Sequence, residues 1–237
     1  MLEKISLKEA WTGLADCGQC AIRKSVLFAG LEVQDFGKIH DPIVQIELAP
    51  GDTLYRAGER SPRLFTLRKG LIKLVRYLPD GTQRIVRLIR STDVTGLEAL
   101  LDKPYEHHAI AMQDSELCVL PAAIVNQLSR ENPALHRELL NRWQRALAEA
   151  DQWLTDLSTG SARQRVARLI LHLTHDDGDG PRCTLFSREE IGAMLGITTE
   201  TASRIVADFR RRGILRTIES KRYEVDTEAL AGLADGG

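Results

Sequence analysis

Four polar side chains between positions 199 and 204 carry the hydrogen-bonding groups that distinguish base pairs in DNA. Thr199, Glu200, Ser203 and Arg204 recur at helical spacing. A glutamate can accept a hydrogen bond from the N4 amino group of cytosine, and an arginine can donate two to guanine. A short helix with such a face is hard to explain as part of a core. The pattern is typical of a helix that enters a major groove.

A first helix must precede this face. Ser187 and Glu190 have the spacing of a capping box, which predicts a helix beginning here. Its buried side is given by apolar residues at helical spacing, namely Ile191, Met194 and Leu195. Gly196 ends this helix, because glycine adopts the positive φ that a C-cap requires.

A second helix follows at once. Thr198 or Thr199 can cap it. We expect its buried side to contain Ala202, Ile205, Val206 and Phe209. The polar side chains described above then lie on the opposite side. Two short helices joined by a glycine turn predict a helix-turn-helix.

The charge of the chain is unevenly distributed. The net charge is −1 and charged residues make up 27% of 237 residues, so the whole protein is not a polycation. Between positions 204 and 222, however, seven residues are basic and two are acidic. The basic ones are Arg204, Arg210, Arg211, Arg212, Arg216, Lys221 and Arg222. Such a local excess is expected where phosphates bind.

Gross features exclude several classes of protein. No apolar run approaches membrane-spanning length, and Met1-Leu-Glu-Lys does not begin a signal peptide. Four cysteines do not suggest a secreted disulfide scaffold. No nucleophile elbow, phosphate loop or HExxH motif supports an enzyme. We expect a cytoplasmic protein that is not an enzyme.

The front half of the chain predicts an antiparallel sandwich or barrel. Five short extended segments are expected at Ile43–Leu48, Leu64–Leu67, Leu71–Leu78, Arg84–Ile89 and Leu117–Leu120. Turn signals separate them, and Asp80-Gly81 between two alternating runs is a strong hairpin signal.

A long helix is expected from about Pro133 to Leu157. Its apolar residues are spaced alternately by three and four, at Leu140, Trp143, Leu147, Ala150, Leu154 and Leu157. This heptad seam favours a partner helix. Arg142, Arg145, Glu149 and Asp156 are predicted outside it. No charge interrupts the seam, so dimerisation should not depend on neutralising one.

The remaining segments complete a DNA-binding half. Ser158–Ser161 predicts a hinge, Ala162–Thr174 a helix, and His175–Arg182 a polar loop. Ile214–Val225 predicts a β-hairpin wing with Lys221 near its tip.

Taken together, these parts resemble the CRP/FNR family of bacterial transcription regulators. The resemblance runs from Cys17 to about Val225, and its most specific parts are Gly51–Glu59 and Glu200–Arg204. It implies an α+β fold with an N-terminal antiparallel β-roll of the cyclic-nucleotide-binding type, a dimerisation helix and a C-terminal winged helix-turn-helix. Four domains are expected. Residues 1–40 form a cysteine-containing helical segment and residues 41–130 the roll. Residues 131–158 form the dimerisation helix and residues 159–237 the DNA-binding domain.

The resemblance also implies base-reading residues. In the FNR branch, a Glu-x-x-Ser-Arg face reads TTGAT-like half-sites, and Glu200, Ser203 and Arg204 match it position by position. Candidates for phosphate or flanking contacts are Thr199, Arg188, Arg210 and Lys221. A homodimer would place two recognition helices about one DNA turn apart, which predicts an inverted repeat. RNA polymerase is the further partner that the resemblance implies.

The family's cyclic-nucleotide pocket is altered here. That pocket uses a Gly-Glu pair and a downstream Arg-Ser/Thr pair that holds the phosphate. The corresponding effector-pocket residues are Gly96, Glu98, His107 and His108, with the histidines at the Arg-Ser positions. Without the guanidinium fork a phosphate has no bidentate partner, so we do not expect cAMP binding. Two interpretations of the histidines are open. They form the polar rim of an unused pocket, which we favour, or they ligate haem.

Cysteines offer another signal. Cys17-Gly-Gln-Cys20 and Cys118 resemble three of the four ligands of the iron–sulfur cluster in oxygen-sensing FNR proteins. The third N-terminal cysteine is absent, since Val26 and Phe28 occupy its usual positions. Cys183 is expected to be structural or incidental.

Three outcomes are open. A non-cysteine ligand such as Asp16, Glu32 or a histidine completes a labile cluster. The Cys-x-x-Cys pair forms a thiol–disulfide switch. The motif is a remnant, leaving a constitutive dimer controlled by its abundance or by another ligand, which the uninterrupted seam favours. Two rivals from other classes are a ligand-binding module acting through protein contacts and, more weakly, a redox enzyme built on Cys17 and Cys20.

Overall fold

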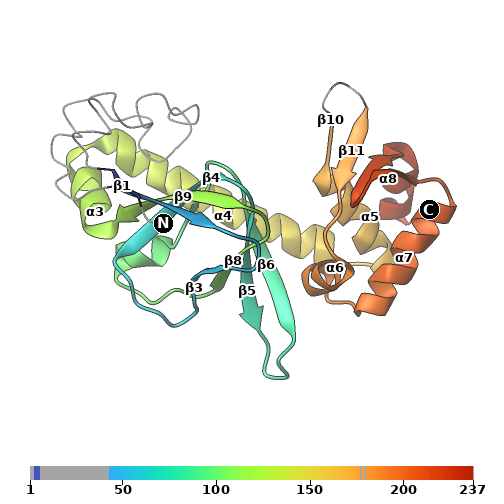
Figure 1. Cartoon of the computed structure of the whole chain (residues 1–237), viewed down its shortest axis with the longest axis horizontal. Coiled ribbons are helices and arrows are strands. Elements are labelled where there is room, and N and C mark those ends of the chain that lie inside the picture. Colours follow the sequence, from blue (N-terminus) through green and yellow to red (C-terminus); the bar gives the residue numbers. More distant parts are fainter. Residues whose placement is uncertain (1–2, 6–42, 177, 179, 237) are drawn as a thin grey trace. The chain divides into compact units, whose positions relative to one another are not determined.

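The computed structural model describes residues 3–5, 43–176, 178 and 180–236 (Figure 1). Cys17 and Cys20 lie outside the described residues, as does most of the predicted helical segment 1–40. The chain divides into two compact units, residues 1–76 with 86–147 and residues 77–85 with 148–237. None of the described helices is long and apolar enough to cross a membrane.

The first half of the chain forms two antiparallel sheets. One has the strand order β1-β2-β9-β4-β7, with bounds Glu3–Ile5, Ile43–Leu48, Ser115–Pro121, Arg63–Lys69 and Val94–Thr95. The other has the order β3-β8-β5-β6, with bounds Thr53–Tyr55, His108–Ala111, Ile72–Tyr77 and Gln83–Ile89. The predicted β-roll is confirmed, although the short strands β3, β7 and β8 were not predicted. Glu3–Ile5 forms strand β1, which pairs with β2, so the prediction of a helical segment over 1–40 is wrong at these residues.

Alternation along the strands builds the core of the roll. Phe65 pairs with Val119 and Leu67 with Leu117, and all four are buried. Tyr55 stacks on the ring of Phe65, with a centroid separation of 5.8 Å. This period of two places alternate residues of β4 and β9 on opposite faces of one sheet.

The predicted hairpin turn between β5 and β6 is confirmed. The amide of Leu78 donates to the carbonyl of Thr82 at 2.9 Å, and Asp80 Oδ1 accepts from the amide of Thr82 at 2.9 Å. An aspartate side chain that bonds the backbone two residues on stabilises such turns.

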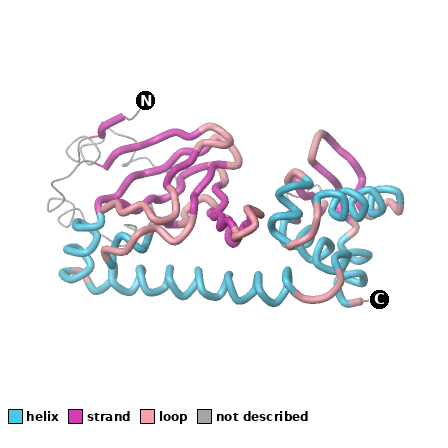
Figure 2. The backbone as a smooth tube through the Cα atoms, turned by 90° about the horizontal axis from the view of Figure 1, so that it is seen from below, coloured by secondary structure: helices cyan, strands magenta, loops and turns pink. Residues whose placement is uncertain are grey.

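Helices connect the roll to the C-terminal half. The 3-10 helix η1 spans Leu97–Leu101, α3 spans Ala122–Glu131 and α4 spans Pro133–Ser158. Figure 2 shows α4 as one uninterrupted helix, as predicted. The separate helix α3 was not predicted.

Arg142 corrects one detail of the α4 prediction. Arg142 was expected on the solvent side of the helix, outside the seam, but it is only 8% exposed. Its Nε lies 2.8 Å from Glu138 Oε1, and its Nη1 donates to the carbonyl of Thr92 at 2.6 Å. Arg142 therefore attaches α4 to the turn before β7, because a buried guanidinium needs charged and carbonyl partners.

The second half holds the elements predicted to bind DNA. Its helices are α5 (Ala162–Leu173), α6 (Arg188–Leu195), α7 (Thr199–Arg211) and α8 (Thr227–Asp235). Its sheet has the order β10-β11-β13-β12, with bounds Thr174–Asp176, Pro181–Thr184, Arg222–Val225 and Leu215–Glu219. The predicted wing is β12 and β13. A polar loop was predicted at His175–Arg182, but the two ends of this segment belong to strands β10 and β11. Helix α8 was not predicted.

Candidate nucleic-acid interface

Helix α6 is fixed at both ends as the sequence predicts. Ser187 Oγ accepts from the amide of Glu190 at 3.2 Å, and Glu190 Oε2 accepts from the amide of Ser187 at 3.1 Å. Gly196 ends the helix with φ of 63°. Ile191 and its apolar neighbours Met194 and Leu195 are buried.

The turn between α6 and α7 depends on a second glycine, which sequence reasoning missed. A Cβ placed on Gly192 would lie 2.7 Å from the carbonyl oxygen of Ile197. The same oxygen belongs to the turn that leads into α7. Any larger residue would therefore push the two helices apart, because a real Cβ cannot approach so closely. A glycine in mid-helix was the available signal.

Helix α7 is positioned by a cap and an apolar face. Thr198 Oγ1 accepts from the amide of Thr201 at 3.2 Å, so Thr198 and not Thr199 is the N-cap. Ala202, Val206 and Phe209 are buried. Ile205 is only half-buried, which corrects its predicted place in the core.

The opposite face of α7 is open to solvent. Thr199, Glu200, Ser203 and Arg204 are all exposed. The pKa of Glu200 is lowered by its own backbone N–H at the helix N-terminus and by the Thr198 hydroxyl. Glu200 is thus an ionised acceptor at neutral pH. Within the described part of the chain, no carboxylate pairs with Arg204, so its five donors remain available.

The basic cluster is partly neutralised by one aspartate. Asp208 accepts from Arg211 at 3.0 Å and from Arg163 at 2.5 Å, and Arg212 lies 4.0 Å away. Although desolvation opposes the shift, the Arg211 hydrogen bond and the charges of Arg163 and Arg212 hold the pKa of Asp208 below its usual range. Arg211 and Arg212 are therefore less suited to bind phosphate than the sequence count suggests.

Other cations remain exposed without a carboxylate partner among the described residues. Arg210 follows Arg204 on α7, and Arg216 and Lys221 lie on the wing. Lys221 sits at the wing tip with φ of 65°. Arg188 begins α6 and is half-buried. Arg216, which the sequence pattern did not single out as a contact residue, is exposed like Lys221.

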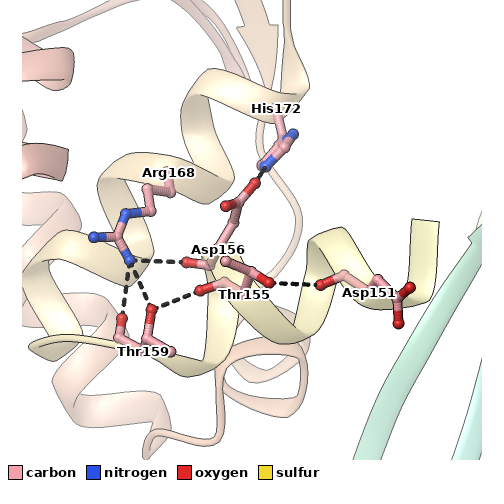
Figure 3. Close-up of polar contacts among 6 residues, drawn as sticks. All are labelled: Asp151, Thr155, Asp156, Thr159, Arg168 and His172. Carbon is pink, nitrogen blue, oxygen red and sulfur yellow. Dashed lines mark hydrogen bonds and ion pairs between the residues drawn. The ribbon is translucent and has the colours of Figure 1, made fainter. Parts of the chain in front are cut away.

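Arg168 was missed by sequence reasoning and links three segments of the second half of the chain. Figure 3 shows its contacts with Asp156 and Thr159. Its Nη1 donates to the carbonyls of Asp156 at 3.1 Å and Thr159 at 3.0 Å, and its Nη2 donates to the carbonyl of Ala234 at 2.8 Å. These are terminal carbonyls of α4 and α8, which have no partners within their helices. His172 Nε2 lies 2.9 Å from the carboxylate of Asp156 in the same cluster.

The predicted seam on α4 divides into two parts. Leu140, Trp143, Leu147 and Leu154 are 57%, 42%, 64% and 67% exposed, and Ala150 is exposed as well. Leu157 is only 2% exposed, because it packs within its own chain. Its predicted place in the seam is therefore wrong, since it has almost no surface left for a partner.

The roll holds the candidate effector residues close together. Gly96 precedes η1, and Glu98 Oε1 accepts from the amide of Glu106 at 3.3 Å. Ligand atoms of Glu98, Glu106 and His107 lie within 4.8 Å of one another. Burial, opposed by the charge of Glu98, lowers the pKa of His107, and His108 begins β8. A neutral imidazole has one N–H donor and no charge, so it cannot make the charged, bidentate contact that a guanidinium makes with a phosphate.

The remaining cysteines differ in setting. Cys118 is half-buried on β9, paired in register with Gln45 on one side and Thr66 on the other. Cys183 is fully buried, and burial raises the pKa of its thiol to about 12. Such a thiol is unreactive at neutral pH, which agrees with the structural role predicted for it.

Comparison with known proteins agrees with this arrangement. Residues 45–132 match the model of the cyclic nucleotide-binding domain, and residues 164–233 match that of the Crp-like helix-turn-helix domain. A probable transcriptional activator of Rhizobium leguminosarum bv. viciae is 30% identical over 213 residues, which cover 87% of each chain. The chain belongs to the CRP/FNR family of transcription regulators.

Further members of the CRP/FNR family resemble the chain over most of its length. The transcriptional activator protein FnrA of Stutzerimonas stutzeri is 27% identical over 94% of this chain and 93% of its own. The solved structure of a CRP-family transcriptional regulator from Thermus thermophilus superposes with a TM-score of 0.70 and 28% identity, covering 81% of this chain and 97% of that one. The protein is accordingly a DNA-binding transcription regulator and not an enzyme.

Proposed function

We propose that this regulator is a homodimer that recognises an inverted repeat of TTGAT-type half-sites. The observation that carries the proposal is the exposed face of α7, where Glu200, Ser203 and Arg204 lie together and Arg204 has no carboxylate partner among the described residues. Arg204 would donate two hydrogen bonds to a guanine, and ionised Glu200 would accept from a cytosine amino group. Ser203 would supply a short hydroxyl contact between them.

Backbone contacts would set the register of this face. Thr199 and Arg188 lie at the N-terminal ends of α7 and α6, and Arg210 and Lys221 extend the positive surface toward the wing. Contacts to phosphate position a protein without reading sequence. Variants of these residues should therefore weaken binding to all duplexes alike.

Dimerisation is proposed from the exposed apolar residues of α4. Leu140, Trp143, Leu147 and Leu154 form a row of large apolar side chains in water, interrupted only by the small Ala150. Parallel pairing with a second copy would bury the row and present two recognition helices to successive turns of DNA. RNA polymerase is the expected further partner, since two of the relatives are transcriptional activators by name.

The proposed signal is redox chemistry at sulfur. Cys118 would be the ligand or exchanging thiol from the roll, with Cys17 and Cys20 as its partners in the chain. Buried hydrogen-bond donors beside Cys118 fit a charged sulfur and support this assignment. An iron–sulfur cluster, when bound, supplies oxygen-sensitive electron transfer. A thiol–disulfide switch and an effector-independent regulator with a vestigial motif are the other two outcomes.

One experiment tests both the proposed DNA half-site and the proposed redox signal. The protein is purified without oxygen, its visible spectrum is recorded, and iron and sulfide are assayed. Fluorescence anisotropy then measures its affinity for a duplex carrying a TTGAT inverted repeat, before and after exposure to air, against a duplex with both half-sites scrambled. Selective binding that changes in air is expected. Equal affinity for both duplexes would refute the half-site assignment, and a colourless protein unaffected by air would leave an effector-independent regulator.

A further inference from the structure

Three residues form one row across the first sheet of the roll. Cys118 on β9 is the direct cross-strand partner of Gln45 on β2 and of Thr66 on β4. Directly opposed residues of antiparallel strands project to the same face, with Cβ atoms about 4.5–5.5 Å apart. The Thr66 hydroxyl and the Gln45 amide therefore belong to side chains on either side of Cys118, on one face of the sheet.

This row contains buried donors that have no hydrogen-bond partner. Thr66 is 3% exposed, and its Oγ1 has no hydrogen-bond partner. The Nε2 atom of Gln45 is also buried and has no hydrogen-bond partner. A buried polar group without a partner destabilises a protein, because it loses its hydrogen bonds to water. Valine would fit a strand equally well at position 66 and would avoid that penalty.

The roll satisfies its other buried hydroxyl groups. Thr95 Oγ1 is hydrogen-bonded to the hydroxyl of Tyr55, and Ser115 Oγ donates to the carbonyl of Gln113 at 2.8 Å. Thr66 is thus the exception among the buried threonines and serines of the described residues. Unsatisfied buried polar groups are rare in native proteins, and a redox role or a bound ion is among the explanations for them.

We propose that Thr66 and Gln45 donate hydrogen bonds to the sulfur of Cys118 when that sulfur is anionic, as a free thiolate or as a thiolate bound to iron. A neutral thiol is a weak acceptor, whereas charge roughly doubles the strength of a hydrogen bond. The two donors are therefore idle beside a thiol and engaged beside a thiolate. The inference rests on the proposed role of Cys118 in sulfur chemistry, but it requires neither DNA binding nor a cluster.

The decisive test compares Thr66→Val with Thr95→Val in the full chain. The metal-free protein is reduced, and iodoacetamide alkylation of the peptide containing Cys118 is followed by mass spectrometry across pH. Loss of one donor to a charged sulfur should raise the pKa of the Cys118 thiol by about one to two units. Thr66→Val should also raise the melting temperature by roughly 2–4 °C, because an unpaired hydroxyl is removed.

The control variant should behave in the opposite way. Thr95→Val leaves the Tyr55 hydroxyl unpaired, so it should lower the melting temperature and leave the alkylation profile of Cys118 unchanged. Gln45→Leu should repeat the pattern of Thr66→Val. An unchanged Cys118 profile in both Thr66→Val and Gln45→Leu would overturn the proposal, as would a profile that shifts equally in Thr95→Val.

A second arm identifies the form of the anionic sulfur. Wild-type and Thr66→Val proteins are incubated with iron and sulfide under nitrogen, and the decay of visible absorbance in air is timed. Faster decay in the variant assigns the donors to iron-bound sulfur, and absence of colour in both proteins assigns them to the free thiolate. Duplex affinity is measured on the same samples, so that failure of the DNA-binding proposal is recognised separately from failure of this one.

Discussion

Leu147→Ala tests the seam on α4 most directly. Leu147 is 64% exposed within its own chain, so this fraction of its surface is available for burial by a second copy. Full burial of a leucine contributes about 1.5–3 kcal/mol, and 64% of that is roughly 1–2 kcal/mol per copy. A two-fold dimer contains the residue twice, so the variant should lose roughly 2–4 kcal/mol of association free energy. That corresponds to a dissociation constant raised about 30- to 900-fold.

Sedimentation equilibrium over a dilution series measures this constant, and Leu157→Ala is the matched control. Leu157 lies on the same helix at the same three–four spacing, but it is buried in its own chain. Its truncation should lower the free energy of unfolding by about 2–5 kcal/mol and leave the dimer constant unchanged. A dissociation constant that is insensitive to Leu147→Ala, or equally sensitive to both variants, would refute the seam.

Three further predictions concern the DNA-binding half. Arg204→Ala should lose about 1–3 kcal/mol of binding and relax specificity at one guanine, measured by competition among half-site variants, and an equal loss on all sequences would contradict base reading. Asp208 has a depressed pKa, so its stabilising contribution is complete above its unfolded value near 4 and is lost as the pH falls through its lower native value. Asp208→Asn should therefore weaken the acid dependence of urea unfolding, whereas an unchanged pH profile would show that its ion pairs are not stabilising. Arg168→Met should destabilise the protein by about 1.5–3 kcal/mol in the same assay, because terminal carbonyls of α4 and α8 lose their donor, and a neutral result would remove this role.

The helix-turn-helix could be predicted from the sequence because its determinants are local. The capping box at Ser187 and the glycine at 196 act within one turn of chain, and both are found as predicted. The apolar face of α7 is likewise set by helical period. Only Ile205 departs from it, since period alone does not say how far a flank of that face is covered.

The seam was less predictable because spacing does not identify the partner. Leu147 and Leu157 both belong to the alternation of three and four residues, yet one is exposed and the other is buried in its own chain. The burial of Arg142 could not be predicted for the same reason. A charged residue beside a seam is expected to be exposed to solvent, and only the fold brings the carbonyl of Thr92 to its guanidinium. Short elements such as β10 and α8 carry too few residues for a clear pattern.

Residues that act through long-range pairing gave no signal in the sequence. Arg168 reads as an ordinary cation on an amphipathic helix until the ends of α4 and α8 are placed beside it. Thr66 reads as an ordinary strand residue until register places it opposite Cys118. Both roles depend on which distant carbonyl or sulfur faces the side chain, and that information exists only in the fold.

The strength of the seam limits how a signal can act. Leu147 alone is expected to contribute roughly 2–4 kcal/mol to association, and Leu140, Trp143 and Leu154 are large, apolar and similarly exposed. Coupling between a sensor and a distant site is typically about 1–3 kcal/mol. In the proposed dimer, a change at Cys118 of that size is too small to separate two copies held by four such side chains, but it is enough to change DNA affinity by about 5- to 150-fold. The uncharged seam therefore favours a permanent dimer whose affinity for DNA is adjusted, over a regulator that assembles only when the signal is present.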